Sequence, residues 1–201
     1  MTVDPESQNR SVGRQLMQAG MSHLADLSHT RQQLIQAGYH NRSLCLYAKL
    51  GFVATEMLSV MVGEPQQREV PGRTVRPANQ EDAEVCNALC RKVHGFDRGG
   101  EVHGAIEHGT ASVVESEHGI TGYSTGVSFV GHGVGESNED LKALIAATPE
   151  LAPPGIMIPT TNGELFKWCL DNGLRVVQQF TLMDTEPSGP PKGVYWPGIL
   201  C

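Results

Sequence analysis

The chain has 201 residues, which fits one or two domains and is long enough to bury a core. Hydrophobic residues make up 39% and charged residues 18%, which excludes a highly charged disordered chain, and the net charge of −7 gives no overall attraction for nucleic acid. No run of about 18 apolar residues predicts a membrane span, and the N-terminal residues lack the basic and apolar regions of a signal peptide.

The first 62 residues alternate helices and strands. Apolar residues recur at helical spacing over 11–29 and predict a helix. A short strand is expected over 31–37, followed by a second helix over 41–50. Gly51 stands where a left-handed helix terminator is expected, and the apolar, β-branched run 52–62 predicts another strand.

Residues 63–73 contain two prolines, two glycines and four charged residues, and this composition predicts a linker. After the linker we expect, in order, a strand over 74–76, a helix over 80–93, a hairpin of 110–115 and 120–130, a helix over 139–147, a strand over 155–158, a helix over 163–171 and a strand over 174–183. The predicted organisation is therefore a domain over 1–62, a linker over 63–73, a second domain over 74–185 and an extended or irregular C-terminal tail over 186–201.

The two halves share one order of elements: helix, strand, helix, glycine, strand. The order runs over 11–62 in the first half and over 139–183 in the second. A repeated mixed unit of this size predicts a duplicated α/β (mixed α+β) domain and not a short-period solenoid.

The sharpest local signal for chemistry lies in residues 3–17. A short extended piece passes through a polar loop into an amphipathic helix, and Ser11 and Gly13 allow a tight turn. Several N–H groups would then point to one spot at the positive end of the helix, a geometry that binds a diphosphate, and Arg10 and Arg14 could add charge-assisted bonds. From composition alone, an ordinary polar loop that caps a helix is the simpler interpretation.

Two stretches of the first half resemble one known family. Gln8-Asn9-Arg10-Ser11-Val12-Gly13, preceded by Val3-Asp4-Pro5, resembles the coenzyme A pyrophosphate loop Q/R-x-x-G-x-G/A of the GCN5-related N-acetyltransferase superfamily, with Ser11 at the position of the first glycine. Asn41-Arg42-Ser43-Leu44-Cys45-Leu46-Tyr47-Ala48-Lys49-Leu50-Gly51-Phe52 resembles a later motif of the same family. The resemblance implies an acyl-CoA N-acyltransferase-like fold.

The resemblance also implies an activity: acetyl transfer from acetyl-coenzyme A to an amine, by direct attack and without a metal. The coenzyme-binding residues it implies are Val3, Gln8, Asn9, Arg10, Ser11, Val12, Gly13, Arg14 and, for the pantetheine region, Asn41. Tyr47 would protonate the departing thiolate, or it is an aromatic residue of the core. The acceptor would be a small-molecule or peptide amine. The resemblance assigns no general base in residues 1–62, and Glu136 or His132 from the second half are the candidates to replace it.

Members of the family usually place strands and helices before the pyrophosphate loop. Residues 1–62 therefore resemble the C-terminal half of an acetyltransferase, and 74–201 a nearly complete second copy, as in a tandem member with an N-terminally truncated first domain. We expect a homodimer or a complementing subunit to complete such a chain. The other functional hypothesis is a catalytically inactive coenzyme A-binding or regulatory remnant.

The corresponding loop of the second half, residues 131–140, contains three glycines that could form an anion-binding nest. No Gln or Arg precedes them, and Glu136, Glu139 and Asp140 would repel a diphosphate, although acidic residues also suit the start of a helix. This pattern predicts a degenerate copy with a structural or acceptor-shaping role.

The histidines and cysteines predict no metal site. Most of the eight histidines fall in predicted loops, and no pair has the helical spacing with an acid that a zinc hydrolase uses. The five cysteines are odd in number and lack close CxxC pairs, which suits reduced thiols in a cytoplasmic protein. Cys86 and Cys90 lie on the apolar stripe of their predicted helix, so core packing is the favoured role.

Overall fold

A computed structural model describes residues 3–29, 31–187, 189 and 191–199. Among these residues the helices are η1 (Pro5–Ser7), α1 (Val12–Asp26), α2 (Asn41–Lys49), η2 (Gln80–Asp82), α3 (Ala83–His94), α4 (Gly99–Glu107), α5 (Asn138–Ala146) and α6 (Gly163–Asp171). The strands are β1 (Gln33–Ala37), β2 (Val53–Gly63), β3 (Thr74–Pro77), β4 (Ser112–Ser116), β5 (Gly119–Ser124), β6 (Gly133–Gly135), β7 (Leu151–Pro159), β8 (Leu174–Asp184) and β9 (Val194–Trp196).

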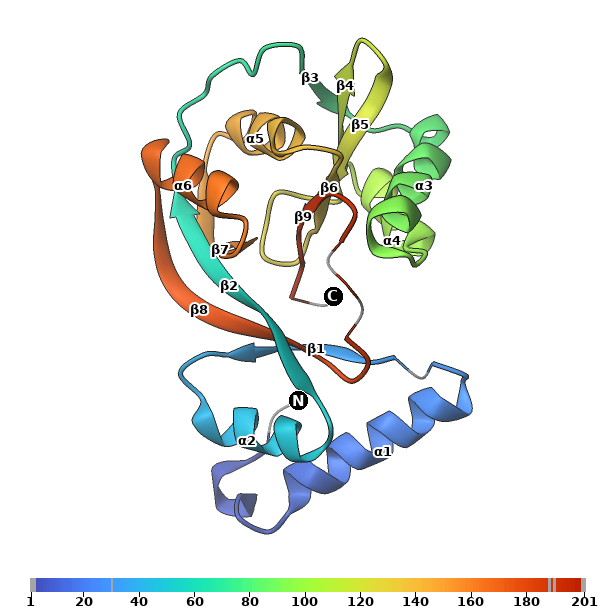
Figure 1. Ribbon diagram of the computed structural model, residues 1–201, viewed down its shortest axis with the longest axis vertical. Helices are drawn as coiled ribbons and strands as arrows, with labels where there is room; N and C mark the ends of the chain where they lie inside the picture. The colour runs from blue at the N-terminus through green and yellow to red at the C-terminus, as the bar shows by residue number, and fades with distance from the viewer. Residues whose placement is uncertain (1–2, 30, 188, 190, 200–201) are drawn as a thin grey trace.

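Two antiparallel sheets organise the molecule. One has the order β1-β8-β2-β7 and the other the order β3-β4-β5-β6-β9. Figure 1 shows β2 and β8 running side by side from an end that carries α1 and α2 to an end that carries α5 and α6. These two long strands therefore connect the two ends of the molecule.

The halves of the chain exchange strands in the first sheet. β8, from the second half, lies between β1 and β2 of the first half, with Ile35 of β1 opposite Leu182. β2, from the first half, lies between β7 and β8, so that Ser59 faces Ile158 on one side and Gln179 on the other. Neither half builds this sheet alone, and the segment 64–73 that joins them has no regular structure.

The core lies almost entirely at the end built by the second half. Its largest cluster joins α5, α6 and β7, with Leu144, Ile156, Leu165 and Trp196 fully or almost fully buried. β2 enters this core along only part of its length: residues 53–57 are mainly exposed, and residues 58–62 are buried. Apolar burial of this kind contributes roughly 25 cal/mol per Å².

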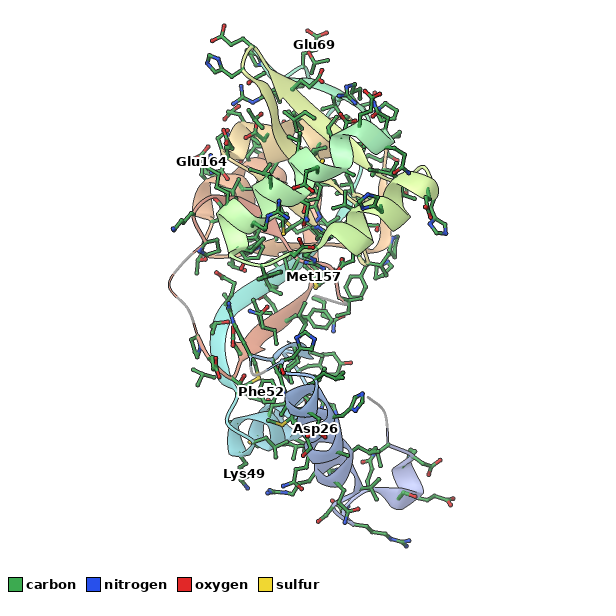
Figure 2. The ribbon with its side chains drawn as sticks, turned by 90° about the vertical axis from the view of Figure 1, so that its right-hand side faces the viewer. Asp26, Lys49, Phe52, Glu69, Met157 and Glu164 are labelled. Carbon is green, nitrogen blue, oxygen red and sulfur yellow. The ribbon has the colours of Figure 1, made fainter. Side chains whose placement is uncertain are left out.

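The end that carries α1 and α2 contrasts with this core. Neither helix has a buried residue, and Leu16 and Leu24 of α1 and Leu27, the residue just after it, are 48%, 39% and 55% exposed. Figure 2 shows Asp26 and Lys49 at this end, well separated from Glu69 and Glu164 at the other. The apolar stripe that predicted α1 is therefore present but faces solvent along part of its length.

Three elements differ from the expectation. The glycine-rich segment 99–107 forms α4, the glycine-rich segment 133–135 forms β6, and residues 194–196 of the tail form β9. The predicted strand over 120–130 ends at Ser124. β6 and β9 pair with each other, so tertiary contact specifies both strands where local sequence does not.

Candidate functional site

The N-terminus of α1 is open. Ser11 precedes the helix with a left-handed backbone (φ 61°), and among the described residues no side chain caps the first turn. The first hydrogen bond of the helix runs from the Gln15 N–H to the Ser11 carbonyl at 3.0 Å. The N–H groups of Val12, Gly13 and Arg14 therefore remain available at the positive end of the helix dipole, a position that favours an anion.

A cavity of about 380 Å³ lies at this turn. The loop before α1, the start of α1 and one side of α2 line it: Val3, Ser7, Gln8, Asn9, Ser11, Val12, Gly13, Arg14, His40, Arg42, Ser43, Leu46 and Tyr47. The structure thus brings together residues from both sequence motifs. Of the predicted site residues, Arg10 and Asn41 are not among those that line the cavity, and their roles stay predictions.

Arg42 joins the two motifs. Its guanidinium donates to the Asn9 side-chain oxygen at 2.6 Å and to that of Gln8 at 3.3 Å. With Arg14, it brings a second cationic side chain to the cavity. Arg42 was not among the predicted site residues. Its position in the first turn of α2 could have indicated it, because the helix dipole disfavours a cation there unless a nearby anion compensates.

The position of α2 is fixed from β1. The buried Gln36 side chain donates to the His40 carbonyl at 2.9 Å and to the Ser43 hydroxyl at 3.2 Å. The His40 side chain caps the helix by accepting from the Ser43 N–H at 3.3 Å. These bonds hold the first turn of α2, and hence Arg42, beside the loop.

Tyr47 lines the same cavity and is half-buried. Its ring makes an edge contact with Phe52, with ring centroids 6.2 Å apart. Partial burial raises the pKa of the hydroxyl above its ordinary value, so the group stays protonated at neutral pH. Tyr47 therefore makes an aromatic packing contact and also lines the cavity, and its role as a proton donor stays a prediction.

The matching turn of the second half is closed by its own side chains. The Asp140 carboxylate, fully buried, accepts from the Ser137 N–H at 2.8 Å, from the Thr121 hydroxyl at 2.7 Å and from Arg73 Nε at 2.5 Å. A buried side-chain carboxylate thus already occupies the start of this helix. The start of α5 is a satisfied helix cap, paired with a cation across the molecule.

The strand before this turn is also covered. β9 pairs along β6, and the buried Trp196 ring lies against Gly133, where a Cβ atom would come within 2.5 Å of three ring atoms. The C-terminal strand therefore fills the space beside the glycine-rich loop.

His132 and Glu136 have structural partners. His132 is buried, with Nε2 2.9 Å from the Tyr123 hydroxyl and Nδ1 3.3 Å from a Glu101 oxygen. This geometry suits a neutral ring that accepts from Tyr123 and donates to Glu101, in agreement with burial lowering the pKa of His132. Glu136 pairs with Lys92 at 2.6 Å.

The cysteines in α3 and α6 are packing residues. Cys86, Cys90 and Cys169 are buried, and burial raises the pKa of the Cys86 and Cys169 thiols to about 12. Among the described residues, no group of three or more His, Cys, Asp or Glu side chains could hold a metal ion. Over the same residues, no helix is long and apolar enough to cross a membrane.

Comparison with solved structures identifies the architecture. A protein of Pyrococcus horikoshii proposed to be an acetyltransferase superposes with a TM-score of 0.63 at 19% identity, over 96% of this chain and 68% of its own. The chain has the fold of the GCN5-related N-acetyltransferases. Members of that group from Sphaerobacter thermophilus (TM-score 0.55, 14% identity, 96% of this chain and 74% of theirs) and Anabaena variabilis (0.52, 12%, 92% and 53%) are also similar.

The comparisons by sequence find less. No model of a known protein family matches the chain, and no curated protein matches it. At identities of 12–19%, the similarity to solved structures concerns the fold, and this fold is the mixed α+β arrangement that the resemblance implied.

Proposed function

We propose that the chain binds acetyl-coenzyme A at the start of α1 and transfers the acetyl group to an amine. The contrast between its two helix-start turns carries this proposal. At α5 the buried Asp140 carboxylate occupies the helix start and pairs with Arg73, whereas at α1 no described side chain caps the first turn and two arginines, Arg14 and Arg42, line the cavity beside it. A diphosphate would supply the missing acceptors.

Each part of the cavity then has a role. The N–H groups of Val12, Gly13 and Arg14 would hold the diphosphate, and Arg42, already fixed by Asn9 and Gln8, would add a charged donor. Tyr47, kept protonated by partial burial, would give its proton to the thiolate that leaves when the amine attacks the thioester.

The chain would comprise two copies of one unit, the first represented by its C-terminal half. Two observations support this arrangement. The orders α1-β1-α2-β2 and α5-β7-α6-β8 are the same, and each copy inserts its last strand between two strands of the other. The second copy, with its closed turn, would serve the first as a structural support.

A coenzyme-binding protein without turnover is the second candidate. The observation that favours it is the make-up of the cavity: its described lining comes from residues 3–14 and 40–47, which are loop and helix residues, so that within the described part of the chain no strand lies beside Tyr47 in the cavity.

An acetyl-transfer assay separates the two candidates. Thiol release from acetyl-coenzyme A is followed with a panel of amines, for the wild type, Tyr47→Phe and the control Tyr39→Phe, whose ring is exposed outside the cavity. We expect amine-dependent turnover that Tyr47→Phe lowers by at least about tenfold without weakening coenzyme binding, and that Tyr39→Phe leaves unchanged. Coenzyme binding with no thiol release for any amine would support the second candidate.

A further inference from the structure

A second, larger cavity lies where the two halves of the chain meet. Its volume is about 600 Å³, within the range of small-molecule sites. The start of β1, parts of β2 and β8, the turn after α3 and the segment that leads into β9 line it. It shares no lining residue with the cavity at α1.

The lining of this cavity is rich in cations. Arginine and lysine side chains outnumber acidic ones by five to two in a chain whose net charge is −7. The cations are Arg31, Arg91, Lys92, Arg98 and Lys192, and the acids are Glu56 and Asp184. Arg31, Arg91, Lys92 and Arg98 each pair with a carboxylate, so the attraction for an anion rests on Lys192 and on the guanidinium N–H groups that these pairs leave unused.

Arg91 and Lys92 form ion pairs with carboxylates outside the cavity, so they are less available to bind an anion. Arg91 pairs with Glu84 and Asp97, and Lys92 pairs with Glu136. Lys192, by contrast, has an exposed side chain with no ion-pair partner among the described residues.

Two arginines of the lining are held in place by a carboxylate, and each keeps some guanidinium N–H groups without an acceptor in the described part of the chain. Arg98, 9% exposed, donates from Nε and Nη2 to Glu101 at 3.0 and 2.6 Å, and Arg31 donates from Nε and Nη2 to Asp184 at 2.9 and 2.6 Å. Within the described part of the chain, Nη1 of each guanidinium has no acceptor. A guanidinium fixed by one carboxylate is preorganised to bind a second anion through its remaining donors.

Aromatic rings form one wall of the same cavity. The His94 ring stacks on Phe96 with centroids 5.3 Å apart and meets Tyr195 edge-on at 4.9 Å. Burial, with the nearby charges of Arg98, His132 and Arg31, lowers the pKa of His94 to about 4, so its ring is neutral at pH 7. Phe96 remains 37% exposed and leaves an aromatic surface for a planar group.

We propose that this cavity binds a small organic anion in which a carboxylate or a phosphate group is attached to a planar ring. Arg31, Arg98 and Lys192 would hold the anionic group, and the His94–Phe96–Tyr195 wall would pack against the ring. The site is independent of the coenzyme site and does not rest on the function proposed for it.

Calorimetric titrations test the proposal with four probes: adenosine monophosphate and benzoate, and the neutral analogues adenosine and benzamide. We expect at least one anion to bind at least about tenfold more tightly than its neutral analogue, with an affinity that falls as salt rises. The anion that binds more tightly distinguishes a phosphate from a carboxylate ligand.

Variants locate the binding. Lys192→Gln, at an exposed position where the fold should tolerate it, is expected to weaken the anion about threefold or more, and Lys192→Glu further. Lys49→Gln, the same substitution on α2 outside both cavities, and Ser11→Glu, at the coenzyme loop, should have no effect. The proposal is overturned if neither anion binds, if anions and neutral analogues bind equally, or if the Lys192 variants bind like the wild type.

Discussion

At the scale of single residues, the buried contact between Tyr123 and His132 illustrates how the second half uses its polar side chains. The Tyr123 hydroxyl is 2.9 Å from His132 Nε2, and the other ring nitrogen faces Glu101. Burial of Glu101 by itself would raise its pKa, but the bonds from His132 and Arg98 prevail and lower it to about 2. This chain of contacts gives the buried His132 ring a polar partner at each of its nitrogens.

Tyr123→Phe should therefore destabilise the protein. The substitution keeps the ring but leaves His132 Nε2 buried without its donor, which costs about 1–3 kcal/mol of unfolding free energy. Urea denaturation followed by circular dichroism measures the change. Tyr39→Phe is the matched control. Tyr39 is 74% exposed, so the loss of its hydroxyl should change the free energy of unfolding by less than about 0.5 kcal/mol. Equal effects of the two variants would contradict this account of the contact.

At the scale of elements, the helices and strands with a strong periodic pattern of apolar residues are the ones whose bounds the sequence predicts well. The helices α2, α5 and α6 and the long strands β2 and β8 lie within one or two residues of their predicted bounds, because apolar patterns mark all five and a following glycine also marks the ends of α2 and α6. α4 was missed because Gly99, Gly100 and Gly104 interrupt its pattern. β6 and β9 were missed because each is three residues long and depends on the other.

The same limit applies to the site. The two motifs supplied most of the loop residues around the α1 cavity, but the site residues predicted from them omit Arg42 and include Arg10 and Asn41, which do not line it. The exchange of β2 and β8 could not be predicted, because it pairs strands that lie far apart in the sequence, and local patterns do not specify such pairs.

The contact between β6 and β9 provides a test at this scale. Gly133→Ala would place a methyl group within 2.5 Å of the buried Trp196 ring and should destabilise the protein by about 1–3 kcal/mol through overpacking. Gly104→Ala is the control: it lies in α4 with no atom within 4 Å of the added carbon, and it should stabilise the helix by up to about 1 kcal/mol. Thermal denaturation compares the two variants, and a neutral Gly133→Ala would contradict the packing described.

At the scale of the whole molecule, the strand exchange makes the two halves interdependent. The segment 64–73 joins them and has the composition of a linker, but β2 and β8 each lie between strands of the other half. The division of the chain into domains at 63–73 stays a prediction from the sequence, and in the folded protein strands of both halves share one sheet.

Cutting this segment tests the interdependence. A site-specific protease sequence inserted after the exposed Gln67 allows one cut, and we expect the two fragments to elute together in buffer and to separate only in denaturant. The expected association follows from the ladders that β2 makes with β7 and β8. Fragments that separate in buffer would show that each half folds alone.

The central claim is that the turn at α1 binds the diphosphate of coenzyme A. Calorimetric titration of coenzyme A into Ser11→Glu and Ser28→Glu tests it most directly, because both serines are exposed and left-handed (φ 61° and 65°) at opposite ends of the same helix. A carboxylate at the start of α1 interacts favourably with the helix dipole and should not unfold the helix. A loss of coenzyme A binding in Ser11→Glu would therefore come from the site itself.

We predict that Ser11→Glu weakens coenzyme A by at least about tenfold with an unchanged or higher melting temperature, while Ser28→Glu binds like the wild type. Equal affinity of the two variants for coenzyme A, or no binding by the wild type at millimolar concentration, would contradict the claim.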